Sequence, residues 1–186
     1  MVGRLRENRD NLAHDFLKPN LSTDTKFFIL DNLLPEDLVL NIFKNFPDKS
    51  MWNYEDTFRE KKYTFAKLGE LKNPLPEQVT DCLQSKPVIE EIKQITQIDD
   101  LEGDPSLYAG GLSRMEKSHF LNPHIDNSHD RDRTRYRRLN LLYYVSPGLK
   151  EKDGGNFELW DRQVKNPLKL PSKFNRLIVM ETNSTS

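Results

Sequence analysis

The sequence has little cysteine and no long apolar run, and each shortage excludes a class of protein. Cys82 is the single cysteine among 186 residues, so no internal disulfide can form and a reducing compartment is expected. No apolar run approaches the roughly 20 residues that a membrane-spanning helix needs. The N-terminal stretch mixes charged and apolar residues and lacks the apolar core of a signal peptide. We therefore expect a cytoplasmic protein with no membrane partner.

The sequence also lacks an excess of charge of either sign. Lys and Arg total 28 against 29 Asp and Glu, a formal net charge of -1, so bulk electrostatics indicate no polyanionic partner. Hydrophobic residues make up only 35%, but 10 Phe, 6 Tyr and 2 Trp side chains can each bury a large area. The length is that of one domain with a modest core.

The first 106 residues favour helices around one strand. Leu5, Leu12 and Phe16 recur at near-helical spacing and predict an exposed amphipathic helix over residues 4–17. The rest of this part is predicted as a strand at 26–30, helices after Pro35, at 77–83 and from Pro87, and a loop with at most one strand at 50–70.

From Leu107 onward, short apolar runs alternate with Gly, Pro and Asn, which indicates successive strands. They are predicted at 107–112, 120–125, 139–145, 156–160 and 177–180. We predict an α+β fold, a double-stranded β-helix (jelly roll) with N-terminal helices packed on it. A single domain over 1–186 would comprise an N-terminal helix and linker (1–22), a strand with supporting helices (23–106) and the jelly-roll core (107–186).

A His-x-Asp pair at residues 124–126 is the candidate for chemistry. Residues two apart on a strand face the same side, so His124 and Asp126 would converge on one point. An imidazole and a carboxylate with open positions are two-thirds of the ligand set of non-haem Fe(II) oxygenases. A single His-x-Asp also arises by chance, as a capped turn or a surface pair. The motif alone therefore does not decide the function.

The order of the segments around the pair is more specific than the pair itself. HIDN at 124–127 is followed by RRLNLLYYV at 137–145, GGNFELWD at 154–161 and PSKFNRLIVMETN at 171–183. In this order the segments resemble the prolyl-4-hydroxylase-like branch of the Fe(II)/2-oxoglutarate-dependent oxygenases. The resemblance covers residues 107–186 and, more faintly, 27–46. It implies a dioxygenase that hydroxylates a C–H bond of a peptidyl side chain, prolyl among them, or of a small molecule. Fe(II) is the implied cofactor, 2-oxoglutarate the co-substrate and ascorbate a candidate reductant.

The resemblance also assigns roles to particular residues. It implies that His124 and Asp126 are the first two iron ligands. Tyr144 corresponds to the tyrosine that hydrogen-bonds 2-oxoglutarate, or else it is an aromatic residue that lines the barrel. Gly154 and Gly155 correspond to a tight turn in which a positive φ requires glycine.

The sequence departs from the family pattern in two places. Many relatives carry a tyrosine shortly before the first ligand, where this chain has Arg114 and Met115. The third ligand of the family, a histidine, and the basic residue that grips the far carboxylate of 2-oxoglutarate would both fall beyond Ser186. The remaining histidines are interpreted as solvated or capping residues: His14, His119 and His129. We therefore expect a C-terminally incomplete oxygenase domain that is inactive as it stands.

Two functions of other classes stay open. The first is a non-catalytic jelly-roll binding module that lacks a complete metal site. The second is nucleic-acid binding through the arginine-rich stretch at residues 129–138, which otherwise is a solvated loop or meets an anionic substrate at the mouth of the site. The expected partner is a peptide, protein or small-molecule substrate rather than a nucleic acid.

Overall fold

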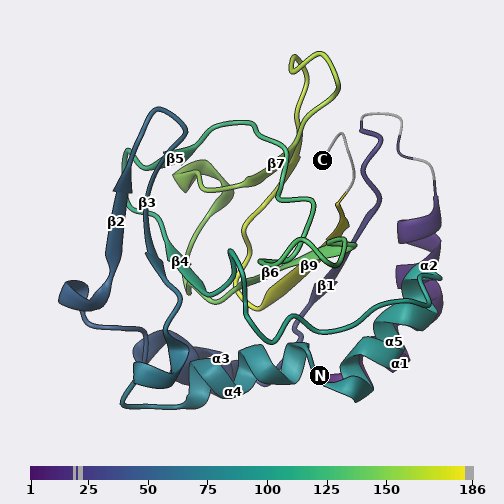
Figure 1. The fold of residues 1–186 in the computed structure, drawn as a ribbon, viewed down its shortest axis with the longest axis horizontal. Coiled ribbons are helices and arrows are strands. Elements are labelled where there is room, and N and C mark those ends of the chain that lie inside the picture. The colour runs from purple at the N-terminus through teal and green to yellow at the C-terminus, as the bar shows by residue number, and fades with distance from the viewer. Residues whose placement is uncertain (19, 21–22, 183–186) are drawn as a thin grey trace.

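The protein has helices along one side and antiparallel strands on the other (Figure 1). The computed structural model describes residues 1–18, 20 and 23–182. The helices are α1 (Val2–Glu7), α2 (Arg9–Leu17), α3 (Glu36–Lys44), α4 (Leu75–Leu83) and α5 (Lys86–Thr96), with short 3-10 turns at Lys49–Met51, Leu68–Glu70 and Glu151–Asp153. The strands are β1 (Phe27–Asp31), β2 (Asn53–Asp56), β3 (Glu60–Phe65), β4 (Leu112–Arg114), β5 (Phe120–Leu121), β6 (Leu139–Tyr144), β7 (Phe157–Leu159), β8 (Leu168–Leu170) and β9 (Arg176–Glu181). The α+β class agrees with the prediction, and no closed barrel forms among the described residues.

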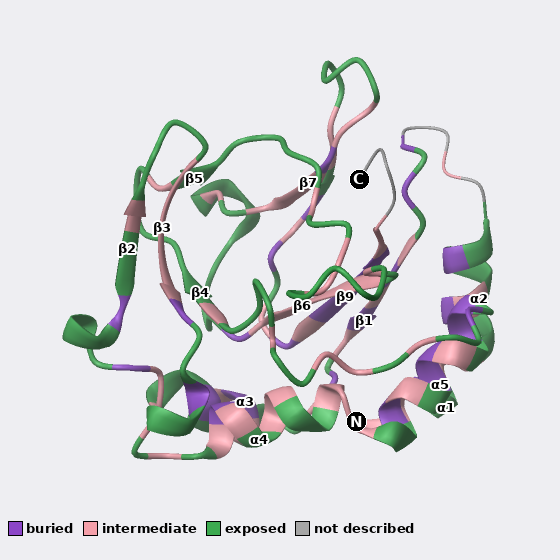
Figure 2. Cartoon of the chain, viewed as in Figure 1, coloured by how far each residue is buried: buried purple, intermediate pink, exposed green. Residues whose placement is uncertain are grey.

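Strand β9 is the centre of the main sheet, whose strand order is β1-β9-β6. Its run Leu-Ile-Val-Met is buried throughout, because each face of the strand packs against a different core (Figure 2). Leu177 and Val179 join the core under the helices, which we call the helix-side core. Ile178 and Met180 pack against Leu159 and Leu170 of the β7–β8 pair, which we call the strand-side core. A continuous apolar run is what a strand buried on both faces requires.

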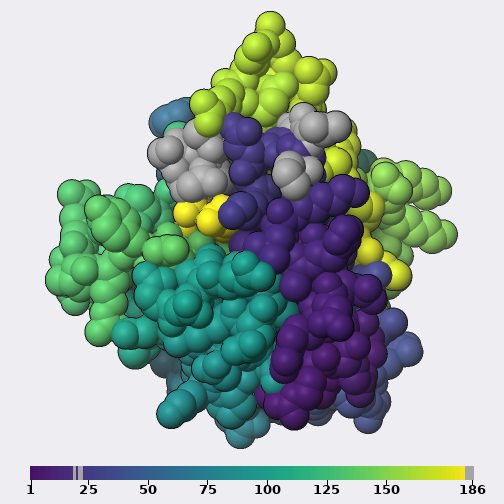
Figure 3. All heavy atoms as spheres, turned by 90° about the vertical axis from the view of Figure 1, so that its right-hand side faces the viewer, coloured from purple at the N-terminus to yellow at the C-terminus, as the bar shows by residue number. Residues whose placement is uncertain are grey.

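The N-terminal segment forms two helices, and its apolar stripe is buried. The predicted single helix over 4–17 is interrupted at Asn8, which leaves α1 and α2. Leu5, Leu12 and Phe16 belong to the helix-side core, so the expectation of an exposed helix is wrong for this stripe. Figure 3 shows this segment lying directly beside α5. Burial of each such side chain contributes roughly 1.5–3 kcal/mol to stability.

Residues 50–70 form a β-hairpin, so the prediction of a loop with at most one strand is wrong. Strands β2 and β3 pair in antiparallel register, with Tyr54 opposite Tyr63 and Asp56 opposite Lys61. The rings of the two tyrosines stack on each other, and Asp56 and Lys61 form an ion pair. Because most of the hairpin side chains are polar and only partly buried, the sequence shows no apolar alternation. β3 also pairs with β4 and β5, which completes the second sheet.

The strands predicted at 107–112 and 120–125 are mostly irregular. Only Leu112 of the first and Phe120 and Leu121 of the second are in strands. The chain turns before β4 because the carboxylate of Asp104 accepts hydrogen bonds from two backbone amides further along the turn. At Gly111, a Cβ atom would lie 2.6 Å from the carbonyl oxygen of Phe65, so only glycine allows this approach. The predicted strands at 139–145, 156–160 and 177–180 are confirmed, whereas β8 was not anticipated.

The glycine turn expected at residues 154–155 is present in the structure. Gly154 and Gly155 have φ values of 85° and 70°, which confirms the turn that requires glycine. Cys82 lies exposed on α4. None of the helices in the described part of the chain is long and apolar enough to cross a membrane.

Candidate metal centre

His124 and Asp126 point toward each other across a short gap. The Nε2 atom of His124 lies 3.3 Å from Oδ1 of Asp126, and the two side chains are 25% and 20% exposed. They are not on a regular strand, because β5 ends at Leu121 and residues 122–128 belong to no helix or strand. The two side chains nevertheless converge, as the spacing of two residues predicts.

Each member of the pair is held by a second hydrogen bond. The Nδ1 atom of His124 lies 2.8 Å from the carbonyl oxygen of Asn122. Because a carbonyl can only accept, Nδ1 carries the proton and Nε2 is the nitrogen that faces Asp126. The Nδ2 atom of Asn140, on β6, donates to Oδ2 of Asp126 at 2.8 Å, which leaves Oδ1 toward the imidazole. Outer partners of this kind orient the ligands of metal sites.

The pair suits a cation between Nε2 and Oδ1. The pKa of His124 is raised, chiefly because Asp126 accepts its hydrogen bond, with burial acting in the opposite direction. The pKa of Asp126 is lowered, chiefly by His124, against the effect of burial and with the help of Asn140. A positive charge is therefore favoured between the two atoms. Adjacent ligands about 2.1 Å from one divalent ion lie about 3 Å apart, close to the separation seen here.

A third side-chain ligand is not supplied by the residues that the structure describes. No group of three or more His, Cys, Asp or Glu residues there could hold a metal ion. His14 is exposed on α2, and His129 bonds Ser128 and lies 4.4 Å from the ring of Tyr136. The expected solvated or capping role is wrong for His119, whose Nδ1 is buried without a hydrogen-bond partner in the described part of the chain.

Tyr144 lies on the same face of β6 as Asn140, four residues further along. Burial raises the pKa of the Tyr144 hydroxyl to about 12, so the hydroxyl stays protonated and can donate a hydrogen bond. It makes no hydrogen bond to another described residue, and its ring packs on the strand-side core. The structure thus brings His124 and Asp126 together, while Tyr144 is placed roughly 13 Å along the strand from Asn140.

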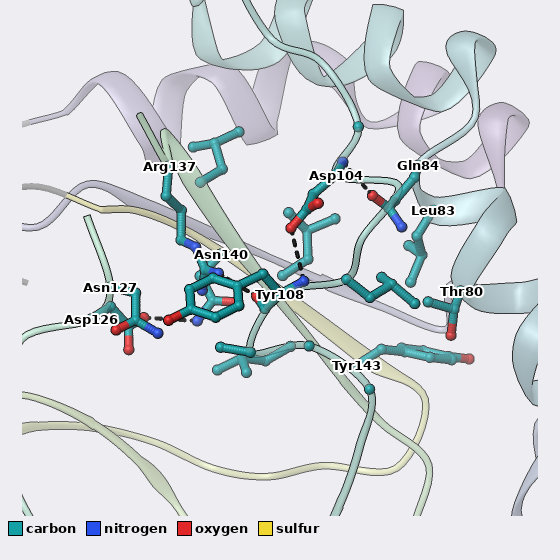
Figure 4. Close-up of a pocket in the computed structure, with 18 of the residues that line it drawn as sticks. Thr80, Leu83, Gln84, Asp104, Tyr108, Asp126, Asn127, Arg137, Asn140 and Tyr143 are labelled. Atoms are coloured by element: carbon teal, nitrogen blue, oxygen red, sulfur yellow. Dashed lines mark hydrogen bonds between the residues drawn. The ribbon is translucent and has the colours of Figure 1, made fainter. Parts of the chain in front are cut away.

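A cleft of about 990 Å³ opens beside the pair (Figure 4). Its wall includes His124, Asp126 and Asn140, and also Tyr143, which lies on the opposite face of β6 from Tyr144. The cleft reaches both faces of β6 because this strand is at the edge of its sheet in the described part of the protein. Tyr144 is not among the residues that line the cleft.

A strained loop brings Tyr108 to this cleft. Its neighbours Leu107 and Ala109 have φ values of 45° and 55°, a conformation that side chains disfavour. Asp104 accepts a hydrogen bond from the Tyr108 amide, and Arg137 donates to the Tyr108 carbonyl oxygen at 2.6 Å. In Figure 4 the ring extends from the loop toward Asp126 and Asn127.

Sequence reasoning missed Asn140, Asn122 and Tyr108. Asn140 could have been found, because a polar residue within the apolar run 139–145 has to find a partner when it is partly buried. No signal in the sequence indicates Asn122 or Tyr108, since their positions depend on backbone contacts with distant segments.

Comparison with known proteins bears on the region that holds this pair. Residues 110–186, less than half of the chain, match a family model described as the 2OG-Fe(II) oxygenase superfamily. None of the curated proteins matches the chain. The matched region contains His124, Asp126, Asn140 and Tyr144, and the family implies Fe(II) and 2-oxoglutarate and a dioxygenase type of function. The match thus supports placing residues 110–186 in the 2OG-Fe(II) oxygenase superfamily.

Proposed function

We propose that this protein provides the first two iron ligands of an Fe(II)- and 2-oxoglutarate-dependent dioxygenase that hydroxylates a C–H bond. The observation that carries the proposal is the convergence of His124 Nε2 and Asp126 Oδ1 at 3.3 Å, each held by an outer hydrogen bond. The family match of the same region supports it. The substrate is a peptidyl side chain, prolyl among them, or a small molecule.

The chain's own residues position the reaction. His124 and Asp126 would hold Fe(II), which together with 2-oxoglutarate supplies the oxidising power for O2-dependent hydroxylation. Asn140 keeps Oδ2 of Asp126 occupied so that Oδ1 is free for the metal. Tyr144, protonated and without another hydrogen-bond partner among the described residues, would donate to a carboxylate of 2-oxoglutarate.

A jelly roll is the architecture we propose for the complete site. β6 and β4 each have one edge without a strand partner in the described part of the chain, and the cleft beside the metal pair lies next to both strands. Additional strands along these edges would close the sandwich and could carry the third ligand. The described residues bring no third His, Cys, Asp or Glu to this pair.

A non-catalytic binding module of the same fold is the second candidate. It is favoured by the lack of a third ligand among the described residues. The two candidates differ in whether the pair binds a metal at all.

Anaerobic titration with Fe(II) and 2-oxoglutarate tests the proposal. Bound together on a protein, they give a visible charge-transfer absorption, and imidazole in solution can stand in for a missing histidine. We expect the band with the wild-type chain plus imidazole, its loss in His124→Ala and Asp126→Ala, and a weaker affinity for 2-oxoglutarate in Tyr144→Phe. His129→Ala is the matched control and should keep the band. Absence of the charge-transfer band from the wild-type protein with imidazole would favour the binding module.

A further inference from the structure

The tip of the β2–β3 hairpin is tied directly to the metal pair by Asn122. The Nδ2 atom of Asn122 donates to the carbonyl oxygen of Phe58 at 2.7 Å, and its backbone amide donates to that of Arg59 at 2.8 Å. The carbonyl oxygen of Asn122 in turn accepts the hydrogen bond from His124. One residue therefore fixes both the hairpin tip and the orientation of the imidazole.

The tip is ordered, yet it exposes a large aromatic side chain. The Oγ1 atom of Thr57 accepts hydrogen bonds from the amides of Arg59 and Glu60, both at 3.2 Å, so the turn is built by its own contacts. Phe58 at its apex is 92% exposed and contributes little to packing. Ile125, between the two members of the metal pair, is 60% exposed. Both side chains are free to make apolar contacts with a bound partner.

Arg59 supplies a positive charge at the same place. Most other cationic side chains in the cleft wall have partners: Lys62 pairs with Glu60, Arg135 with Glu102 and Arg138 with Asp100, and Arg137 donates to the carbonyl oxygen of Tyr108. The guanidinium of Arg59 makes no hydrogen bond or ion pair with any residue the structure describes, although it lines the cleft with His124. A guanidinium in this position is suited to a carboxylate, which it binds through two parallel hydrogen bonds.

We propose that Phe58 and Arg59 form a recognition site for a polypeptide substrate that carries an acidic side chain close to an apolar one. The inference rests on the proposed function, because the bound segment would present a neighbouring residue to the metal pair. A polypeptide fits better than a small molecule, since the apolar side chains lie on an open rim rather than in an enclosed pocket. The tie through Asn122 gives the site a fixed position relative to His124.

Immobilised pools of degenerate nonapeptides test this site. Two pools differ only in the central residue, Glu in one and its neutral isostere Gln in the other. We expect the wild-type protein to be retained about fivefold more strongly by the Glu pool, the strength of a well-formed, partly exposed ion pair. Arg59→Gln should abolish the preference, Arg59→Lys should keep part of it, and Phe58→Ser should weaken retention on both pools.

The matched control is Arg131→Gln. Arg131 is also exposed and without a side-chain partner among the described residues, but it does not line the cleft. The control should keep the full preference. Equal retention of the wild-type protein by the two pools, or an equal loss in Arg131→Gln and Arg59→Gln, would overturn the proposal. Mn(II) binding by the same wild-type preparation is measured in parallel, and its absence would count against the proposed function alone.

Discussion

At the scale of single residues, the metal pair depends on polar neighbours that bind no metal themselves. Asn122 fixes the imidazole of His124 through its carbonyl oxygen, and Asn140 fixes the carboxylate of Asp126 through its amide. Both neighbours act on the side of the ligand that faces away from the gap. The geometry at 3.3 Å is therefore a property of four residues from the β5–β6 segment rather than of the His-x-Asp motif alone.

Asn140→Ala should weaken metal binding while leaving the fold intact. Without the amide, the carboxylate of Asp126 can rotate, and loss of an outer partner of this kind typically costs about tenfold or more in metal affinity. The measurement is Mn(II) affinity together with the midpoint of thermal unfolding. Asn45→Ala is the control, because the Asn45 amide only bonds Asn41 on α3. An unchanged Mn(II) affinity in Asn140→Ala would show that the contact does not position Asp126.

Asn175 is a second polar residue that satisfies several buried hydrogen-bonding groups at once. It is 3% exposed, and its side chain accepts hydrogen bonds from the Leu34 amide and the Tyr143 hydroxyl and donates to the Leu34 carbonyl oxygen. Its φ of 61° also suits asparagine better than most residues. Asn175→Ala should lower the free energy of unfolding by about 3 kcal/mol, because several buried groups lose partners. Urea denaturation measures this, with the exposed Asn166→Ala expected to be neutral.

At the scale of elements, the N-terminal helices are fastened to α5 through a buried carboxylate. Glu91, whose side chain is 5% exposed, lies 2.7 Å from Arg6 and 2.6 Å from Arg9. Arg9 first, and then Arg6, hold the pKa of Glu91 below its usual value against the effect of burial. A lowered pKa in the folded state stabilises the protein above the unfolded pKa, and this stabilisation is lost as the pH falls through the folded value.

The double variant Arg6→Gln, Arg9→Gln should therefore be destabilised mainly near neutral pH. There it leaves a buried carboxylate without a partner, at a cost of about 3 kcal/mol. In acid the unpaired carboxyl of the variant takes up a proton, and the wild-type ion pair stabilises less because the unfolded chain is also protonated, so the difference should shrink. Urea unfolding at neutral pH and at about pH 4, close to the ordinary pKa of Glu, measures it. An equal loss at both pH values would contradict the ion-pair explanation, and Arg131→Gln should change neither.

The prediction of elements from sequence succeeded where apolar periodicity was strong. The helices α3, α4 and α5 and the strands β6 and β9 follow their patterns, because burial of one face or of both faces determines which residues occur there. The β2–β3 hairpin was missed because its strands are held by cross-strand aromatic and ionic pairs, which leave no apolar period. The strands around Leu107 and Ile125 were over-predicted, since the hydrogen bonds that Asp104 accepts and Asn122 donates keep these segments irregular.

At the scale of the whole molecule, the open sheet edges are the main feature that could not be predicted from the sequence. β6 and β4 each carry an edge with no strand partner among residues 23–182. Such edges favour association with other strands. We expect the sedimentation coefficient of the isolated chain to rise with protein concentration. A value that stays monomeric over a wide concentration range would show that the edges are protected.

The site as a whole was only partly predictable. The pair His124 and Asp126 could be found because the two residues are only two positions apart, so their contact needs no distant segment. The cleft, Tyr108 and Arg59 could not be found, because their positions result from contacts between segments far apart in the chain. The role of Tyr144 stays a prediction, since its face of β6 follows from alternation but its hydrogen-bond partner does not.

Binding of Mn(II), followed by the loss of the electron paramagnetic resonance signal of the free ion, tests the central claim most directly. The account predicts that the chain binds Mn(II) weakly, that added imidazole tightens binding, and that His124→Ala and Asp126→Ala each lower the affinity at least about tenfold. His119→Ala and His129→Ala should bind as the wild-type protein does. Equal affinities in all four variants, or no binding by the wild-type chain even with imidazole, would contradict a metal centre at His124 and Asp126.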